Sequence, residues 1–174
     1  MSEIRAEDVM VPLSSYPHML HFQTLREAVA IIEKAVIEKP AGTSLPRSIL
    51  IFDERYQLLG VVRRRDILRG LEPEFLQNMP LDSRREWFDT GVDPNLLEVQ
   101  AGKMTSGVRK QGERLVSEIM RPLDAKVNYD DHLARIMHEM VTKHENLLPV
   151  IRDNTVVGVV RSVDVFHEVA RLII

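Results

Sequence analysis

The chain has 174 residues, of which 44% are hydrophobic and 28% are charged, as in an ordinary soluble globular protein. The formal net charge of −3 gives no overall attraction to nucleic acid or to an anionic membrane surface, and the absence of cysteine excludes disulfides, thiolate metal sites and a cysteine nucleophile. No apolar run approaches the ~18 residues that span a bilayer, and the N-terminus lacks the apolar core of a signal peptide, so we expect a cytoplasmic protein.

A short motif near the start of the chain returns in the second half. Residues 8–13 read Asp-Val-Met-Val-Pro-Leu, and residues 118–123 read Glu-Ile-Met-Arg-Pro-Leu. Proline lacks a backbone donor and ends a preceding helix, so each copy is expected to open with a helical turn that stops at Met-x-Pro.

An amphipathic helix follows each opening motif. Thr24 and Glu27 form a capping box, in which each side chain covers an orphan N–H group of the other residue. Behind them, apolar residues recur at the spacing of one helix face. In the second copy, Asp130 or Asp131 is the expected N-cap of an equivalent helix.

A buried strand is predicted after each helix. Residues 48–52 and 147–151 are continuous apolar runs, which is typical of strands that are covered on both faces. A polar turn then leads each run into a second apolar segment, so a hairpin of two adjacent strands is expected in each copy.

The clearest repeat lies in these second segments, 98 residues apart. Residues 60–66 read Gly-Val-Val-Arg-Arg-Arg-Asp, and residues 158–164 read Gly-Val-Val-Arg-Ser-Val-Asp. A glycine and two valines predict a short buried strand. The aspartate suits the first turn of a closing helix, where Ser162 or Asp164 could satisfy free N–H groups.

The first copy is longer than the second, and its extra residues fall between the predicted elements. Most of them lie in residues 39–46, whose prolines and glycine predict a surface loop. Residues 73–113 belong to neither copy; they contain two short predicted helices, and the glycine-punctuated basic stretch 103–114 is expected to be mobile. The predicted organisation is therefore a first repeat at 1–72, an insertion at 73–113 and a second repeat at 114–174.

This ordered set of motifs resembles the CBS domain, the cystathionine β-synthase type repeat, and its recurrence resembles a tandem CBS pair, or Bateman module. The resemblance implies an α/β fold with mixed α+β sheets, in which two βαββα units pack with pseudo-two-fold symmetry and a partly helical insertion separates them. Such pairs are regulatory rather than catalytic and often form homodimers. They commonly bind AMP, ADP, ATP, S-adenosylmethionine or sometimes NAD in clefts between the units.

The resemblance also points to site residues. It assigns Asp66 and Asp164 to the ribose hydroxyls, a role that suits a carboxylate because it accepts from both hydroxyls of a diol. Where the family carries serine or threonine, this chain has Arg63, Arg65, Arg161 and Val163. These arginines either pair with the adjacent carboxylate and fill the ribose space, or hold ligand phosphates. The other residues that the resemblance places at the clefts are Ser162, Met120, Pro122, Leu148 and Pro149.

Other functions find less support in the sequence. The run of arginines at 63–65, with the basic stretch 103–114, is interpreted as a solvated surface, so no nucleic-acid or membrane partner is expected. Six histidines show no convergent ligand set, and no catalytic motif is present, so neither a metal site nor an enzyme is predicted. Two functions remain: a ligand-sensing module that signals to a partner protein, and a structural adaptor whose clefts are filled by arginine.

Overall fold

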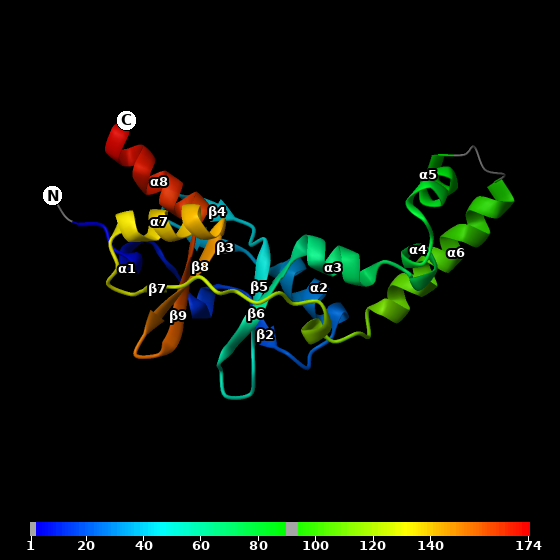
Figure 1. The fold of residues 1–174 in the computed structure, drawn as a ribbon, viewed down its shortest axis with the longest axis horizontal. Coiled ribbons are helices and arrows are strands. Elements are labelled where there is room, and N and C mark those ends of the chain that lie inside the picture. Colours follow the sequence, from blue (N-terminus) through cyan, green and yellow to red (C-terminus); the bar gives the residue numbers. More distant parts are fainter. Residues whose placement is uncertain (1–2, 90–93) are drawn as a thin grey trace.

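The structure is a computed structural model that describes residues 3–89 and 94–174, without the side chains of residues 87–89 and 94–99. Two halves, each combining a sheet with helices, lie side by side, and a helical arm extends from the first half (Figure 1). Both ends of the chain lie far from this arm. Among the described residues, no helix is long and apolar enough to cross a membrane.

The first half contains the elements predicted for the first repeat. Thr24 and Glu27 form the expected capping box: the Thr24 N–H donates to Glu27 Oε2 at 2.8 Å, and the Glu27 N–H donates to Thr24 Oγ1 at 3.3 Å. The predicted strand at 48–52 is also present. The elements in chain order are α1 (Ala6–Val9), β1 (Val11–Pro12), the 3-10 turn η1 (Leu13–Ser15), β2 (His18–Leu20), α2 (Leu25–Lys34), β3 (Ile37–Lys39), β4 (Gly42–Ser44), β5 (Ser48–Phe52), β6 (Leu58–Arg63) and α3 (Arg64–Leu71).

Within the described residues, the second half repeats the order β2-α2-β5-β6-α3 but has no strands equivalent to β1, β3 and β4. The prediction of Asp130 or Asp131 as the N-cap of its first helix is wrong, because the cap is His132, which makes no side-chain cap bond. The Asp131 carboxylate instead accepts from the Asn128 N–H at 2.8 Å. The elements are η2 (Val116–Glu118), β7 (Val127–Asn128), α7 (Leu133–Lys143), β8 (Leu147–Arg152), β9 (Thr155–Arg161) and α8 (Ser162–Ile173).

The strands form mixed sheets, as predicted. One sheet has the order β1-β9-β8-β7 and the other β2-β5-β6, and each combines one parallel pair with antiparallel pairing. Strands β3 and β4 pair only with each other in the part of the chain that the structure describes. These two strands take up part of residues 39–46. The prediction of a surface loop there is therefore wrong in part.

The opening motif of each repeat pairs with a strand of the other half. Val11 of β1 lies opposite Val159 of β9 in an antiparallel pair. In the same way, Arg121 bridges to Val61 of β6, with reciprocal backbone hydrogen bonds of 2.9 and 3.0 Å. The two halves are therefore joined by backbone pairing at symmetry-related places, and the division of the chain into 1–72, 73–113 and 114–174 stays a prediction.

The repeated glycines are needed for this exchange. A Cβ on Gly158 would lie 2.5 Å from the carbonyl oxygen of Val11, and one on Gly60 would lie even nearer to that of Arg121. Only a residue without a side chain allows the two backbones to approach so closely. The glycine that leads each Gly-Val-Val motif thus makes room for the opening motif of the other repeat.

Buried apolar residues form three clusters that follow from the exchange. Ala6 and Val9 of α1 belong to the core of the second half, whereas Val116 of η2 belongs to the core of the first. A third cluster contains residues of both sheets, including Leu50, Val61 and Val159, and so joins the halves. Hydrophobic burial, the main stabilising term in folding, is therefore shared between the two repeats.

The insertion is more regular than predicted. It consists of α4 (Glu74–Gln77), α5 (Leu81–Asp89) and α6 (Pro94–Gln111), which make up the arm in Figure 1. The expectation that residues 103–114 are mobile is wrong, because α6 continues without a break to Gln111. A Cβ on Gly107 would lie 2.7 Å from Pro73, so this glycine permits close packing of the helix on the start of the arm.

Candidate functional site

The carboxylate of Asp66 is held by its own repeat. Its side chain is 4% exposed, and Arg63 binds it through Nε at 3.0 Å and Nη2 at 3.1 Å. The Arg63 N–H donates to the same carboxylate at 2.9 Å. Burial alone would raise the pKa of Asp66, but the hydrogen bonds from Arg63 and the charges of Arg63 and Arg69 outweigh it and lower the pKa.

The carboxylate of Asp164 is held in the same way, with additional partners from the other repeat. Arg161 binds it through Nε at 2.7 Å and Nη2 at 2.8 Å. The Nζ of Lys39, at the end of β3, lies 3.6 Å from Asp164 Oδ1 and also donates to the Val9 carbonyl. Arg161 Nη1 donates to Ser44 Oγ of β4 at 2.8 Å.

Of the two arginine roles that the sequence left open, Arg63 and Arg161 take the one in which the arginine pairs with the adjacent carboxylate, whereas Arg65 makes no such pair within the described residues. A bidentate guanidinium offers two parallel N–H donors to both carboxylate oxygens. It therefore uses the acceptor positions that a ribose diol would use. In the geometry observed, a ribose at Asp66 or Asp164 would have to compete with an arginine for the carboxylate.

A large open cleft lies between the two halves, and we call it the central cleft. Its volume is about 1140 Å³. Six arginines contribute to its lining, together with a single acidic side chain, Glu145. The arginines come from both repeats: Arg47, Arg63, Arg64, Arg65, Arg121 and Arg161.

The arginines of the central cleft differ in how they are paired. Arg121 binds Glu145 through Nη1 at 3.0 Å and Nη2 at 2.9 Å, and this hydrogen bonding raises the pKa of Arg121. Arg47, Arg64 and Arg65 are exposed, and within the described residues their side chains have no hydrogen-bond or ion-pair partner. The cleft therefore carries an uncompensated positive charge.

The rest of the cleft wall is largely apolar. Phe166 and Leu45 are exposed at 74% and 60%. Tyr16 is buried, and its hydroxyl shares a 2.8 Å hydrogen bond with that of Ser48; burial raises the pKa of Tyr16 and keeps the phenol neutral. A site that combines apolar side chains with arginines suits a ligand that has both a flat ring and a charged end.

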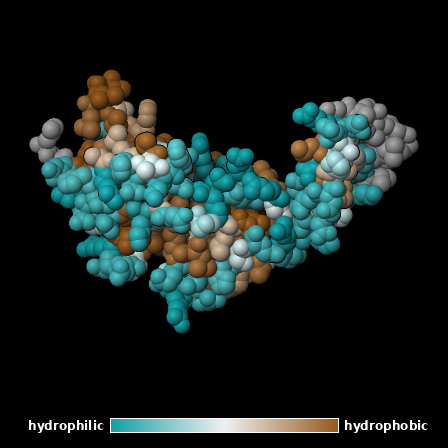
Figure 2. Space-filling model, viewed as in Figure 1, coloured by the Kyte–Doolittle hydropathy of each residue, from teal (hydrophilic) through white to brown (hydrophobic). Residues whose placement is uncertain are grey.

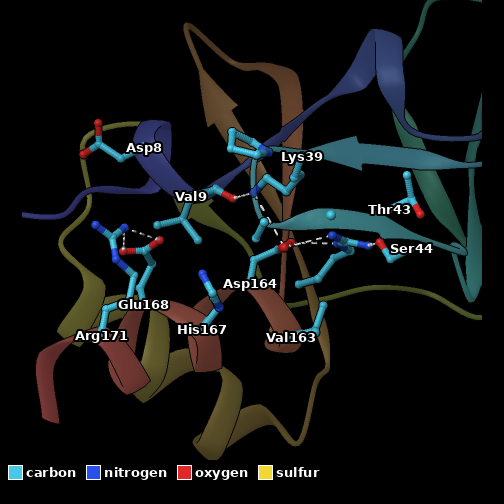
Figure 3. A pocket seen from close by; sticks show the side chains of 14 residues that line it. Asp8, Val9, Lys39, Thr43, Ser44, Val163, Asp164, His167, Glu168 and Arg171 are labelled. Carbon is cyan, nitrogen blue, oxygen red and sulfur yellow. Dashed lines mark hydrogen bonds and ion pairs between the residues drawn. The ribbon is translucent and has the colours of Figure 1, made fainter. Parts of the chain in front are cut away.

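A smaller pocket of about 590 Å³ adjoins Asp164, and we call it the hairpin pocket because β3 and β4 form one of its walls. Figure 3 shows Lys39 and Ser44 on the hairpin side and Asp164, His167 and Glu168 on the side of α8. Its lining includes three cationic and three acidic side chains, so its formal charges balance.

The structure brings only part of the predicted site together. Arg63, Arg65 and Ser162 line the central cleft, Asp164 lines the hairpin pocket, and Arg161 lines both. Asp66 lies buried beneath Arg63 and lines neither. The assignment of these residues to a ligand remains a prediction.

Of the four other predicted residues, Leu148, Met120 and Pro122 lie one position away from a side chain that lines the cleft, and Pro149 does not. Leu148 is fully buried in the core, and its neighbour Leu147 lines the cleft instead. Met120, Pro122 and Pro149 line neither pocket, whereas Arg121 and Leu123 line the cleft. Successive residues of an extended chain point to opposite sides, so a shift of one position reverses the face that a side chain occupies.

The sequence did not indicate several residues of these pockets. Lys39 and Ser44 lie in the segment predicted to be a surface loop, and Arg47, Tyr16 and Phe166 carry no motif of their own. Arg121 is the middle residue of the second Met-x-Pro motif, and the first copy has Val11 at the same place. This replacement of an apolar residue by a cation could have indicated a polar site. Within the described residues, no group of three or more His, Asp or Glu side chains is arranged to hold a metal ion.

Comparisons with known proteins agree with this architecture. Residues 116–171 match the family model for the CBS domain. A search of curated proteins found none that matches the sequence. The CBS domain of a CBS-domain-containing membrane protein from Sphaerobacter thermophilus superposes with a TM-score of 0.65 at 16% identity, over 95% of this chain and 87% of that one.

Two further solved structures are similar and were determined with nucleotides. CBSX2 in complex with AMP has a TM-score of 0.60 and 15% identity, over 97% of both chains. The cytosolic domain of the Mg²⁺ channel MgtE in complex with ATP has a TM-score of 0.60 and 19% identity, over 97% of this chain and 49% of that one. The second repeat is therefore a CBS domain, and the chain as a whole has the fold of a tandem CBS pair.

Proposed function

We propose that this chain is a regulatory module that binds an adenosine nucleotide or a related anionic metabolite in the central cleft and signals to a partner protein. The observation that carries this proposal is the excess of arginine in that cleft, because three of its six guanidinium groups have no carboxylate partner among the described residues. Arginine binds phosphate oxygens in a planar, bidentate way, so the cleft suits a ligand with at least one phosphate.

The unpaired arginines are the groups that would hold the phosphates. Arg64 and Arg65 stand in the first turn of α3, where the helix dipole adds a partial positive charge. Arg47 lies just before β5 and faces the same cleft. The exposed ring of Phe166 offers a surface on which an adenine ring would stack.

The structural relatives support a nucleotide rather than another anion. One was solved with AMP and another with ATP, and both share the fold of this chain. In this chain the carboxylates of Asp66 and Asp164 are already bound by arginine, so phosphate contacts would dominate. A nucleoside without phosphate is expected to bind far more weakly than the corresponding nucleotide.

A second candidate function is a structural adaptor. It is favoured by the same bidentate pairs, Arg63 with Asp66 and Arg161 with Asp164, because they fill the positions of a ribose. In that case the partner surface would lie on the arm formed by the insertion. The adaptor explains the paired arginines but leaves the unpaired ones, Arg47, Arg64 and Arg65, without a role.

We further propose that the chain forms a homodimer through its C-terminal helix. Leu172 and Ile173 form an apolar stripe at the end of α8, where they are exposed at 61% and 79% and line neither pocket. Figure 2 shows this end of the molecule as a hydrophobic surface. Apolar patches of this kind mark interaction sites, and a two-fold contact would bury the same stripe of both copies.

Isothermal titration calorimetry with AMP, ADP, ATP, S-adenosylmethionine and adenosine tests the nucleotide proposal. We expect one of the phosphate-bearing compounds to saturate the wild type and adenosine to bind at least tenfold more weakly. In the variant Arg64→Met/Arg65→Met, affinity should fall at least tenfold. Arg55→Met, in the turn between β5 and β6 and away from the cleft, is the matched control and should bind as the wild type does.

Two results would count against the proposal. If no compound binds, the nucleotide-sensing function is refuted and the adaptor is favoured. If a compound binds equally well to the Arg64→Met/Arg65→Met variant, the ligand is held elsewhere. Thermal unfolding is a second readout, since a ligand at 100 times its Kd stabilises the folded state by about 2.7 kcal/mol.

A further inference from the structure

The hairpin of β3 and β4 distinguishes the two repeats. It lies between α2, which ends at Lys34, and β5, which begins at Ser48, whereas the equivalent connection in the second repeat runs only from Lys143 to Leu147. The hairpin pairs with no other described strand. One of its side chains, Ile37, is buried in the core cluster between the sheets and anchors the first strand.

The polar side chains of the hairpin contact the other repeat. Lys39 donates to the Val9 carbonyl and lies 3.6 Å from Asp164, while Ser44 accepts from Arg161 at 2.8 Å (Figure 3). The side chains of Arg161 and Asp164 are each only 10% exposed. The hairpin thus reaches both members of the pair that the second repeat would present to a ligand.

These contacts use the hydrogen-bonding capacity of Asp164. Its Oδ2 accepts from Arg161 Nε, and its Oδ1 accepts from Arg161 Nη2 and faces Lys39. A carboxylate oxygen has about two lone-pair positions. Oδ1 is therefore fully used, and the one remaining acceptor position, on Oδ2, lies beside Arg161, which is itself fixed by Ser44.

The equivalent site of the first repeat has no such cover. Asp66 is bound by Arg63, and its second ion pair is with Arg69 at 3.9 Å, on the same helix. Arg63 is 39% exposed, against 10% for Arg161. The arginine of the first repeat is consequently held by Asp66 alone, whereas that of the second is also held by the hairpin.

We infer that the hairpin is an intramolecular lid that holds Arg161 on Asp164, with Lys39 as its latch. The two symmetry-related sites of the pair are then unequal, and the chain takes one ligand, in the central cleft, until the lid lifts. The balanced charges of the hairpin pocket agree with a site completed by the chain itself, in contrast to the positive central cleft. The number of ligands rests on the proposed function; the lid does not.

The hairpin is suited to opening. A two-stranded ribbon without further strands is marginally stable in water, so its attachment depends on the contacts that it makes with the body. The turn residues Pro40 and Ala41 and the first two residues of β4, Gly42 and Thr43, are exposed. Loss of the Lys39 contacts would leave Ser44 and Ile37 as its remaining attachments.

Amide hydrogen exchange of residues 37–44 tests the lid without any ligand. In Lys39→Met, which keeps the length of the side chain without its charge, we expect exchange across the hairpin to accelerate at least tenfold relative to wild type. Lys34→Met, on the exposed end of α2, is the control and should leave it unchanged. Lys39→Arg restores a cation with several donors and should restore slow exchange. Unchanged exchange in Lys39→Met would overturn the inference.

Calorimetric stoichiometry with AMP and ATP tests the inequality of the sites. We expect one ligand per chain in the wild type and two in Lys39→Met/Ser44→Ala. Two ligands in the wild type would show that the hairpin does not close the site. If neither protein binds a nucleotide, the proposed function fails, and the exchange experiment still decides whether the hairpin is latched by Lys39.

Discussion

The close approach of the two repeats at Gly60 gives the sharpest test of the fold. Gly60→Ala would place a Cβ against the carbonyl oxygen of Arg121, closer than real Cβ atoms come to any neighbour. That oxygen cannot withdraw freely, because it accepts from the Val61 N–H at 2.9 Å, and the Arg121 N–H donates back at 3.0 Å. The methyl group must therefore push the two backbones apart.

The size of the effect follows from these contacts. Overpacking of a tight site costs about 1–3 kcal/mol, and a weakened hydrogen bond adds about 1 kcal/mol. We expect a loss of about 2–4 kcal/mol in the free energy of unfolding, which corresponds to a fall in Tm of roughly 5–15 °C for a chain of this size. Gly158→Ala should behave alike, since its Cβ would meet the Val11 carbonyl at 2.5 Å.

Urea denaturation followed by circular dichroism measures this loss. The control is Gly102→Ala in α6, where an added Cβ meets nothing within 4 Å. That change should stabilise the protein by about 0.5–1 kcal/mol, because alanine favours a helix over glycine. If Gly60→Ala unfolds within about 0.5 kcal/mol of wild type, the range of an ordinary surface substitution, the exchanged packing of the opening motifs is wrong.

The remaining predictions concern Asp66 and α8. Asp66→Asn should cost about 1–3 kcal/mol at pH 7, because it leaves the buried pair with Arg63 incomplete. The pKa of Asp66 is lowered in the folded state, so this loss should begin to shrink below pH 3.8, its ordinary pKa, and vanish below the folded-state value; a loss that is independent of pH would contradict the charge pairing. Ile173→Ser should shift a dimer toward monomer in sedimentation velocity, and a monomeric wild type would contradict the dimer proposal.

Much of the fold could be predicted because the same signals occur twice. The strand at 48–52 and the capping box of Thr24 and Glu27 are local features, and each was found where the sequence placed it. The glycine pattern of 103–114 was misleading, because Gly107 permits contact with Pro73 rather than flexibility. A glycine in sequence does not distinguish a mobile backbone from a close approach.

The site was less predictable because its contacts join distant parts of the chain. Lys39 lies close to Asp164 although the two residues are far apart in the sequence and belong to different repeats, and no local pattern links them. Strands β3 and β4 contain lysine, glycine, threonine and serine, whose preference for strands is mixed, so their structure depends on tertiary contacts. The pairing of Arg63 with Asp66 was one of two roles that the sequence allowed, and only the geometry shows which applies in this state.

The exchange of the opening motifs has a consequence for synthesis of the chain. The Ala6 N–H donates to the carbonyl of Asp131, and β1 pairs with β9, so residues 6–12 find their partners only once the second repeat has been synthesised. Contacts between residues so far apart in sequence are slow to form. Until they do, Val9 and Val11, both buried in the folded protein, remain exposed on the nascent chain. We therefore expect the first repeat to fold fully only after the second repeat has emerged from the ribosome, and to be open to aggregation or chaperone binding until then.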